Sequence, residues 1–401
     1  MPSAPTPVSP SDYEDQPGPL LLLTIALVGV FAFLQVYSVQ SVLAELQRDL
    51  QATVVEIGRA VGATVLAVAL VSPLMGMVSD ALGRKALVVA SVLVLALPTA
   101  AMMGVQTAHG LTVWRFVQGL AVPGVTVVAI AYIGEEFRGA AMVRVMTLYI
   151  TGCVLGGFLG RYLLGHLTEL MSWHAAFGVM AALNLAGAVL IWRVLPASRH
   201  FVADTRVAHA LVTLGELLRH RALQAAGALG FTALFAQVGM FTFINLHLAA
   251  APYHFSPADL ANVFAVYLVG VVVTPLAGRL IPRLGARRTI LLSVALSALG
   301  VLLTLLAPVP AIVAALALAS CGTFITQSAT LAFIAYRITH GRSLASGLYY
   351  SAYYAGGFCG AWLGGFAYAH GGWPGTVALL LAVQALGWGV AWRFIAAPVK
   401  A

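Results

Sequence analysis

Twelve apolar stretches of about 20 residues follow one another through most of this 401-residue chain. The hydrocarbon core of a bilayer is about 30 Å thick, and a helix needs roughly 20 apolar residues to cross it. The stretches lack the polar alternation of membrane β-strands, and unpaired backbone groups are costly in lipid, so helices are predicted. The expected transmembrane helices lie at residues 20–44, 54–75, 86–106, 111–134, 145–167, 174–194, 223–248, 258–277, 289–306, 309–334, 344–367 and 374–393.

The composition excludes an ordinary soluble protein. Hydrophobic residues make up 61% of the chain and charged residues only 8%, and the mean hydropathy is +0.96, whereas soluble domains carry about 25% charged residues. The predicted fold class is therefore an all-α integral membrane protein. The three cysteines lie apart in apolar stretches without metal-ligand spacing, so we expect neither a metal site nor a cofactor. They are Cys153, Cys321 and Cys359.

The formal net charge of +8 reflects membrane topology. If the first helix leaves the cytoplasm, 17 of the 21 lysines and arginines fall in or beside cytoplasmic loops. This bias is the positive-inside rule, and it predicts that both termini are cytoplasmic. The basic charge is then explained without a nucleic-acid partner.

Two helical bundles joined by a polar linker are expected. The first 19 residues are rich in proline and acidic residues and lack a basic start, which predicts a disordered tail and not a signal peptide. Residues 206–222 place their aliphatic side chains on one helical face, as is typical of a surface helix on the inner leaflet. The predicted segments are a cytoplasmic tail at 1–19, an N-terminal six-helix bundle at 20–195, a cytoplasmic linker at 196–222, a C-terminal six-helix bundle at 223–394 and a cytoplasmic tail at 395–401.

The chain contains an internal duplication. Residues 148–173, LYITGCVLGGFLGRYLLGHLTELMSW, align without a gap with residues 348–373, LYYSAYYAGGFCGAWLGGFAYAHGGW. A second pair, at 71–85 and 273–287, has nearly the same offset. Six helices separate the copies, so both halves have the same orientation in the membrane. Parallel six-helix repeats occur in secondary transporters, which bind substrate near mid-membrane between the halves.

Two motifs carry a family resemblance. GMVSDALGRK (76–85) resembles the loop signature G-x-x-x-D-x-x-G-R-K of the major facilitator superfamily, and RFVQGLAVPG (115–124) resembles its fourth-helix pattern R-x-x-Q-G. With the repeat, the resemblance covers the chain after the tail. AYIGEEF and GGFLGR are similar to the drug:proton antiporter branch and its YnfM-type inner-membrane members. The chain departs from the family patterns at four positions: Ala81, Leu87, Gly157 and Arg161.

The resemblance implies a monomeric secondary active transporter of the inner membrane that works by alternating access. Proton-coupled efflux of a small molecule is the leading expectation, and an importer or exchanger of small organic anions is the alternative. No G-x-x-x-x-G-K-[ST] phosphate loop is present, which argues against ATP as the energy source. A membrane-embedded enzyme would need a recognisable Ser/His or His/Asp constellation, and a sensor would need a signalling domain. We therefore expect a transporter and not an enzyme.

Two groups of residues are candidates for conformational gating. The first is a charged network at the cytoplasmic face, for which a simple topology anchor is the alternative. The second is a pair of glycine faces on which the halves rock against each other, for which static helix packing is the alternative. The network comprises Gly76, Asp80, Gly83, Arg84, Lys85, Glu135 and Glu136, and the glycines are Gly152, Gly156, Gly160, Gly356 and Gly360.

Two arginines lie inside apolar helices. Arg115 and Arg161 are each roughly 7–10 Å below the outer surface at ~1.5 Å per residue, in consecutive helices. A charge inside the membrane costs roughly 2.5–3.5 kcal/mol on insertion scales and needs a partner. Structural partners would be helix carbonyls or the outer acids Glu45, Glu56 and Glu169. The alternative is that both arginines hold an anionic or strongly polar substrate, and Ala361 at the position equivalent to Arg161 indicates that the fold itself needs no charge there.

Further polar residues complete the expected site. The amide side chains predicted to line it, with Arg115 and Arg161, are Gln118, Gln35, Gln237, Asn245 and Gln327. The first helix carries no acid between residues 20 and 44, which argues against a preference for lipophilic cations. Candidates for a proton-coupling group, each with a solvated or capping role as the alternative, are Glu56, Asp259, His166, His247 and His254.

Overall fold

The computed structural model describes residues 17–198, 215–338 and 342–395, without the side chains of 76, 77, 80–82, 342 and 343. In the N-terminal part the helices, with η for 3₁₀, are α1 (Pro19–Phe33), η2 (Ser38–Val42), α2 (Leu43–Asp49), α3 (Val54–Leu82), α4 (Arg84–Ala101), η3 (Met102–Gly104), α5 (Ala108–Ala121), α6 (Pro123–Glu136), α7 (Gly139–Leu170) and α8 (Trp173–Val194). In the C-terminal part they are α10 (Arg221–Ala249), α11 (Pro257–Val263), η4 (Phe264–Leu268), α12 (Val269–Leu303), α13 (Val309–Arg337) and α14 (Arg342–Phe394).

Twelve membrane-crossing helices follow from this order. By length and composition the described residues hold nine apolar helical stretches that can cross a membrane, or ten when the bent pair at the start is one span. The stretches at 257–303 and 344–394 have 47 and 51 residues, or roughly 70 Å and more, which is about twice what a bilayer needs. Each contains a glycine with positive φ, Gly285 at 76° and Gly372 at 56°, where the chain turns back. Each therefore supplies two crossings, and the predicted fold class is confirmed.

The first predicted helix, at 20–44, differs from the prediction because it is broken. The segment α1 ends at Phe33 and η2 begins at Ser38, and the two parts are bent by 52°. Neither glycine nor proline marks this break in the sequence LQVYSVQ. The predicted helix at 111–134 is also interrupted, at Val122 between α5 and α6, where the following proline lacks the N–H that a continuous helix requires.

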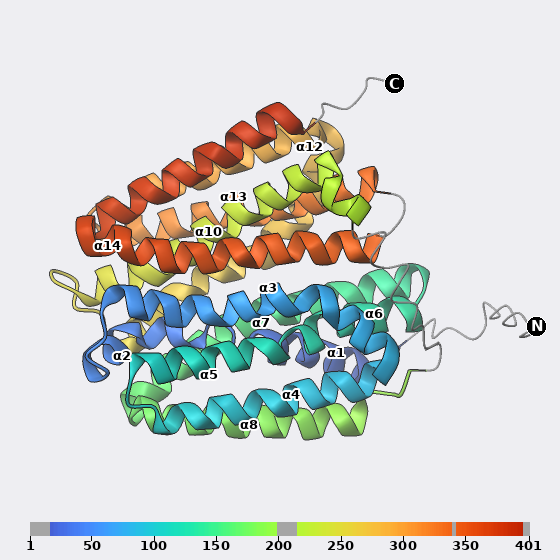
Figure 1. Ribbon diagram of the computed structural model, residues 1–401, viewed down its shortest axis with the longest axis horizontal. Coiled ribbons are helices and arrows are strands. Elements are labelled where there is room, and N and C mark those ends of the chain that lie inside the picture. The colour runs from blue at the N-terminus through green and yellow to red at the C-terminus, as the bar shows by residue number, and fades with distance from the viewer. Residues whose placement is uncertain (1–16, 199–214, 339–341, 396–401) are drawn as a thin grey trace, which may run out of the picture.

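The two repeats lie side by side as separate layers of helices. Figure 1 shows α1 to α8 in the lower part of the molecule and α10 to α14 in the upper part, with the helix axes running roughly along the long axis. We call the end that holds α2 the α2 end, and the end where α4 begins the α4 end.

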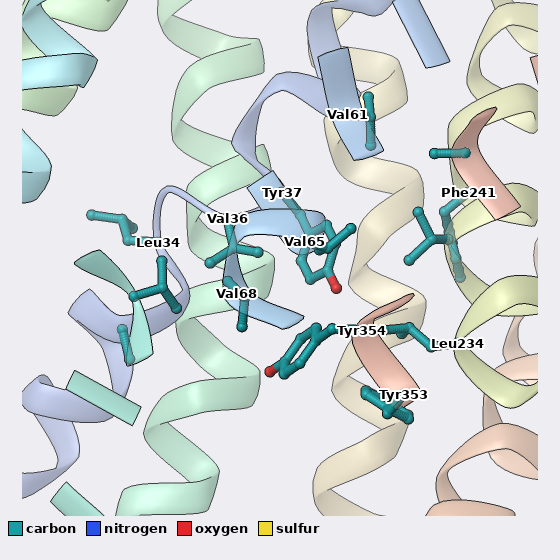
Figure 2. Packing of buried hydrophobic residues seen from close by; sticks show 14 of the residues in the cluster. Leu34, Val36, Tyr37, Val61, Val65, Val68, Leu234, Phe241, Tyr353 and Tyr354 are labelled. Atoms are coloured by element: carbon teal, nitrogen blue, oxygen red, sulfur yellow. The ribbon is translucent and has the colours of Figure 1, made fainter. Parts of the chain in front are cut away.

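Apolar and aromatic side chains fill the contact between the halves. Figure 2 shows Val65 and Val68 of α3 near Tyr37 from the break of the first helix, with Tyr354 of α14 approaching from the other half. Tyr37 and Tyr354 are 7% exposed each, and both valines are fully buried. The broken segment therefore lies at the centre of the molecule, where both halves reach it.

The repeated glycines pack helices within each half, which corrects the prediction that they lie between the halves. A Cβ atom on Gly152 or Gly156 would collide with the backbone of α1, and one on Gly160 with Leu34 just beyond it. In the second copy, Gly356 and Gly360 face the backbone of α10 in the same way. Close backbone approach inside each bundle explains the repeated spacing.

Other glycines lie between the halves at the α2 end. A Cβ atom on Gly62 would lie 2.9 Å from the Phe358 ring, and one on Gly365 would lie 2.9 Å from Cα of Val55. Gly165 of α7 is equally close to α11, because an added Cβ atom would lie 2.6 Å from Cβ of Ala261. Two cross-half contacts, α3 with α14 and α7 with α11, therefore hold this end together.

Candidate functional site

Arg115 holds the break of the first helix. Its guanidinium is fully buried and donates through Nη1 to the backbone oxygen of Gln35 at 2.7 Å and through Nη2 to that of Val36. Gln35 and Val36 follow the end of α1, and the helix does not continue to supply N–H donors for their backbone oxygens. Arg115 therefore supplies the hydrogen bonds that a continuous helix would have made.

Gln118 fixes Arg115 in this position. Its Oε1 accepts from Arg115 Nη1, and its Nε2 donates to Thr99 Oγ1 of α4 at 2.9 Å. The backbone oxygen of Arg115 accepts a hydrogen bond from Thr64 Oγ1 of α3 at 2.9 Å. Gln118, supported by Thr99, thus orients the Arg115 side chain, and Thr64 binds its backbone. The R-x-x-Q pattern of the sequence is explained by this pair, in which the glutamine lies one turn after the arginine.

Arg161 reaches the same broken segment from α7. Its Nε and Nη2 both donate to Oε1 of Gln40 in η2, at 2.9 and 2.7 Å, and its Nη1 donates to the backbone oxygen of Gly157 at 2.5 Å. The guanidinium is fully buried. Both arginines therefore bind the segment 35–40, as expected of residues at one level of consecutive helices.

An aromatic cage surrounds the Arg161 guanidinium. Its Cζ lies 4.8 Å from the ring centroid of Tyr37, 4.5 Å from that of Phe264 and 4.4 Å from that of Tyr267. Phe264 and Tyr267 belong to η4 of the C-terminal half, whereas Tyr37 belongs to the first helix. A cation within about 6 Å of a ring face is attracted to it, more strongly when water is excluded. The charge of Arg161 thus connects the two halves.

Neither buried arginine has an acidic partner among the described residues. Two of the three outer acids that were candidate partners bind elsewhere: Glu56 accepts from Thr53 in a capping box, and Glu169 accepts from the backbone N–H of Ala258 at 3.1 Å. The third, Glu45, has a buried carboxylate oxygen without a hydrogen-bond partner among the described residues. Backbone oxygens, the second structural alternative, account for most contacts of Arg115. For Arg161 the principal partner is a neutral amide, so the positive charge at the centre is solvated by dipoles and rings without being neutralised.

Gln40 links Arg161 to the opposite half. Its Nε2 donates to Thr242 Oγ1 of α10 at 3.1 Å, while its Oε1 accepts from the guanidinium. Gln40 and Thr242 are both fully buried. A continuous polar chain therefore runs from α7 through η2 to α10.

The other predicted site residues lie at separate places. Gln35 donates to the Met180 backbone oxygen at 3.3 Å and so faces α8. Gln237 donates to Ser320 Oγ at 3.3 Å within the C-terminal half, and Asn245 donates to the backbone oxygen of Phe241 at 2.6 Å. Gln327 is half-buried on α13. The structure brings Arg115, Gln118 and Arg161 together around the break. Gln35 lies in the break but turns its side chain toward α8, and Gln237 and Asn245 form their hydrogen bonds within the C-terminal half.

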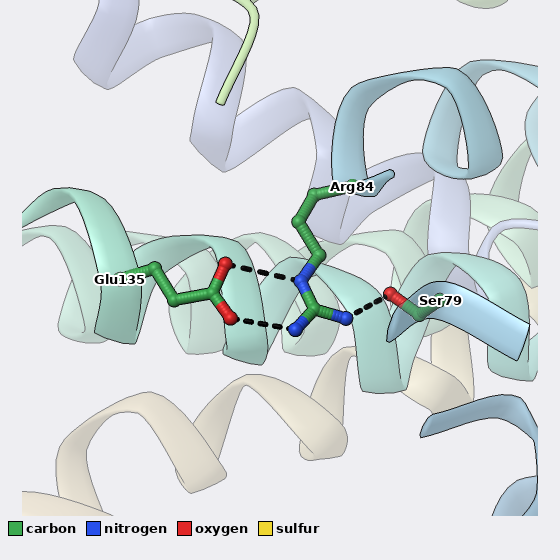
Figure 3. Close-up of polar contacts among 3 residues, drawn as sticks. All are labelled: Ser79, Arg84 and Glu135. Carbon is green, nitrogen blue, oxygen red and sulfur yellow. Dashed lines mark hydrogen bonds and ion pairs between the residues drawn. The ribbon is translucent and has the colours of Figure 1, made fainter. Parts of the chain in front are cut away.

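The predicted charged network at the α4 end contains a two-pronged ion pair. Figure 3 shows Arg84, which donates from Nε and Nη2 to the two carboxylate oxygens of Glu135 at 3.1 and 2.6 Å, and from Nη1 to Ser79 Oγ. Gly83, with φ of 90°, permits the sharp turn between α3 and α4. The pair joins α4 to α6 inside the N-terminal half. Side-chain contacts at Gly76 and Asp80 lie outside what the structure describes, and Lys85 and Glu136 flank the pair in the sequence.

Several candidates for proton coupling have local structural roles. Asp259 caps α11 together with Ser256, as Glu56 caps α3. His166 Nδ1 lies 2.9 Å from the backbone oxygen of Tyr162, and the ring of His247 stacks on Trp373 at 6.0 Å. His254 is exposed. The capping alternative is confirmed for the two acids, while a role in proton transfer remains a prediction for all five.

The aromatic cage was not predicted, although the repeat carries a signal for it. At the offset of 202 residues that relates 71–85 to 273–287, Gly62 corresponds to Phe264, and at the offset of 200 Ala361 corresponds to Arg161. The contact of α3 with α14 thus has the small residues Gly62 and Ala361. The equivalent contact of α7 with η4 has Arg161 and the ring of Phe264. Side chains that differ between the copies at matching positions indicate where the symmetry of the halves is broken.

Two six-helix halves that meet around buried polar side chains define a membrane transporter of the two-repeat class. A family model described as Major Facilitator Superfamily matches residues 25–255 and 241–401, and the chain belongs to this superfamily.

Relatives and a solved structure agree with this assignment. Inner membrane transport protein YnfM of Escherichia coli (strain K12) is 31% identical over 91% of this chain and 89% of its own length. The MFS-type transporter YybF of Bacillus subtilis (strain 168) is 29% identical over 88% and 87%. Chloramphenicol resistance protein CraA of Acinetobacter baumannii is 28% identical over 58% and 56%. A mutant of the nucleoside transporter NupG has the same fold, with a TM-score of 0.79, 13% identity and 94% and 99% coverage.

Proposed function

We propose that this protein is a secondary active transporter that moves a small organic anion across the inner membrane by alternating access between its halves. The observation that carries the proposal is the pair of buried guanidiniums, Arg115 and Arg161, which meet at the break of the first helix without an acidic partner among the described residues. Transport and not catalysis is the proposed activity of this site.

Electrostatics favours an anion at this place. At an effective dielectric constant of ~20, a unit cation about 8 Å from one guanidinium is disfavoured by about 2 kcal/mol, and an anion is favoured by the same amount. Arg161 adds a planar fork that matches a carboxylate or phosphate group. A lipophilic cation would be repelled by the positive charges of both arginines. The first helix has no acid between 20 and 44 to attract it.

We further propose export as the direction. The inside-negative membrane potential favours outward movement of an anion by about 2.3 kcal/mol per charge at 100 mV. Proton entry is the proposed driving reaction. The proposed working unit is a monomer, and both of its termini are proposed to lie in the cytoplasm. The charge distribution in the loops supports the orientation.

Drug efflux is the second candidate. The relative CraA is described as a chloramphenicol resistance protein, and the sequence GGFLGR is similar to the drug:proton antiporter pattern. An uncharged drug would not need the two arginines. The free-energy cost of burying their charges in the membrane would then be offset only by their structural role.

The test is transport by purified protein in liposomes that contain a pH dye. We expect flux of benzoate or lactate that depends on a proton gradient, and none of tetraphenylphosphonium. Liposomes without protein measure passive leakage of the protonated acids. Flux of tetraphenylphosphonium or chloramphenicol without any anion flux would replace the anion proposal by drug efflux.

A further inference from the structure

We propose that the carboxylate of a small aromatic acid replaces Gln40 on Arg161, and that this exchange opens the contact between the halves at the α2 end. The proposal rests on the proposed function and names its substrate class and its binding residue. It also identifies Gln40 as a side chain that occupies the anion site when the substrate is absent.

The geometry of Gln40 resembles that of a bound anion. One amide oxygen accepts from both Nε and Nη2 of Arg161, at 2.9 and 2.7 Å. These two donors form the side of the guanidinium that a carboxylate binds with two oxygens. A carboxylate brings a charge opposite to that of the guanidinium and a second acceptor oxygen, so it competes well against the single neutral oxygen of Gln40.

Arg161 can exchange its partner, whereas Arg115 cannot do so easily. The acceptors of Arg115 include the backbone oxygens of Gln35 and Val36, which are part of the broken helix. The acceptor that Arg161 would lose is a side-chain amide on a rotatable stem. Arg115 is therefore a positioning residue that holds the break, and Arg161 is the residue that binds the substrate.

Displacement of Gln40 also affects the contact between the halves. The same amide donates to Thr242 of α10 at 3.1 Å, so a Gln40 side chain that leaves Arg161 gives up this cross-half hydrogen bond. The guanidinium simultaneously packs on Phe264 and Tyr267 of the C-terminal half. Substrate binding and closure of the α2 end thus use the same atoms, and the anion weakens the closure as it binds.

The cage selects an aromatic acid over an aliphatic one. Three rings lie within 4.8 Å of the Arg161 Cζ, and Phe241 stacks next to them, 5.3 Å from Phe264 and 4.7 Å from Tyr267 between ring centroids. A planar ring attached to the carboxylate can pack against these faces once the ion pair has formed. Aromatic pairs are worth enough to favour benzoate over acetate by about tenfold.

The equivalent place in the other repeat supports a dedicated site. There Ala361 packs against Gly58 of α3, where a Cβ atom on the glycine would meet the Ala361 carbonyl. Tight backbone packing is thus sufficient to close that helix pair. The charge and the rings at Arg161 have no counterpart in this packing, so closure alone does not require them.

The test compares two substitutions of Gln40 that have opposite expected effects. Gln40→Glu places a permanent carboxylate on Arg161 and should weaken benzoate binding at least about tenfold in calorimetry of the purified full-length protein. Gln40→Ala removes the competitor and should strengthen binding a few-fold. Gln384→Ala, a buried glutamine that donates to Ser297 at 2.8 Å in the C-terminal half, is the matched control and should bind like wild type.

Opening is measured with spin labels at Arg48→Cys and Leu306→Cys, both exposed, after replacement of the three native cysteines by serine. Saturating benzoate should lengthen the distance between the labels, and acetate at the same concentration should do so less. In Gln40→Glu the distance should not respond to benzoate. An increase in that variant would overturn the link between exchange and opening.

The outcomes separate this proposal from the proposed function. If benzoate is transported but both Gln40 variants bind it with wild-type affinity, transport of anions stands and the exchange on Arg161 is wrong. If both variants lose affinity equally, Gln40 supports the fold and does not compete with substrate, which also overturns the exchange. If no anion is bound or transported, both proposals fail.

Discussion

A buried arginine can be retained in a membrane without a carboxylate when the surrounding groups replace water. Arg115 uses backbone oxygens and one amide, and Arg161 uses one amide, one backbone oxygen and three rings. Neutral partners solvate a charge but leave its field in place. The acceptors of Arg115 are mostly backbone oxygens of the broken helix, whereas the main acceptor of Arg161 is a side-chain amide. We therefore expect removal of Arg115 to affect mainly the fold and, on the proposal above, removal of Arg161 to affect mainly binding.

Replacement of Arg115 should destabilise the protein. In Arg115→Ala the oxygen of Val36 loses its donor, while that of Gln35 keeps only Ser38 Oγ at 3.2 Å. A buried unpaired acceptor costs about 1–3 kcal/mol. We expect a stability loss of about 2 kcal/mol or more, observed as a lower melting temperature in detergent. Arg115→Lys should recover only part of it, because an ammonium lacks the planar fork. Arg48→Ala, at a side chain that is 73% exposed, is the control, and equal melting of all variants would contradict this role.

At the scale of helices, close packing within a half is distinct from contact between halves. The glycines of α7 and α14 that recur in the sequence pack against α1 and α10, whereas Gly62, Gly165 and Gly365 face the opposite half. In the proposed alternating access, a helix pair inside a bundle stays together, while a pair between bundles separates. Substitutions at the two kinds of glycine should therefore have different consequences.

Alanine at these glycines separates the two roles. Gly156→Ala would collide with Val30 of α1 inside the N-terminal half, and we expect it to lower stability by about 1–3 kcal/mol. Gly62→Ala presses on Phe358 across the halves, so it should favour separation at the α2 end with a smaller stability loss. Thermal unfolding and labelling of an introduced cysteine at the α2 end measure these effects. Gly134→Ala, where an added Cβ atom meets nothing within 4 Å, is the control.

The sequence predicts helices more reliably than it predicts their breaks and partners. Hydropathy and the repeat were sufficient to predict twelve helices in two halves. In lipid the backbone must satisfy its own hydrogen bonds, which restricts a spanning segment to a helix or a strand of a closed barrel. The break after Phe33 had no local signal, since it depends on Arg115, about 80 residues away in the chain. The glycine spacing predicted close packing correctly but not the partner helix. The cage around Arg161 combines residues from three distant segments, which only the folded chain brings together.

At the scale of the whole molecule, the candidate site lies where the two repeats differ. The halves share one fold and orientation, yet only one of the two equivalent cross-half contacts carries a charge, at Arg161 with Phe264 and Tyr267. The other uses Gly58 and Ala361. On the proposal above, the contact of Gly58 with Ala361 serves only for packing, while the contact of Arg161 with Phe264 and Tyr267 binds the substrate between the two halves.

Anion flux in liposomes, compared between wild type and Arg161→Ala, tests the central claim most directly. We predict that benzoate-dependent flux falls at least about tenfold in the variant, because the substrate loses its charged partner, while the melting temperature falls less than in Arg115→Ala. Wild-type benzoate flux in Arg161→Ala would contradict the account, since the buried guanidinium would then be a structural residue and the substrate would bind elsewhere.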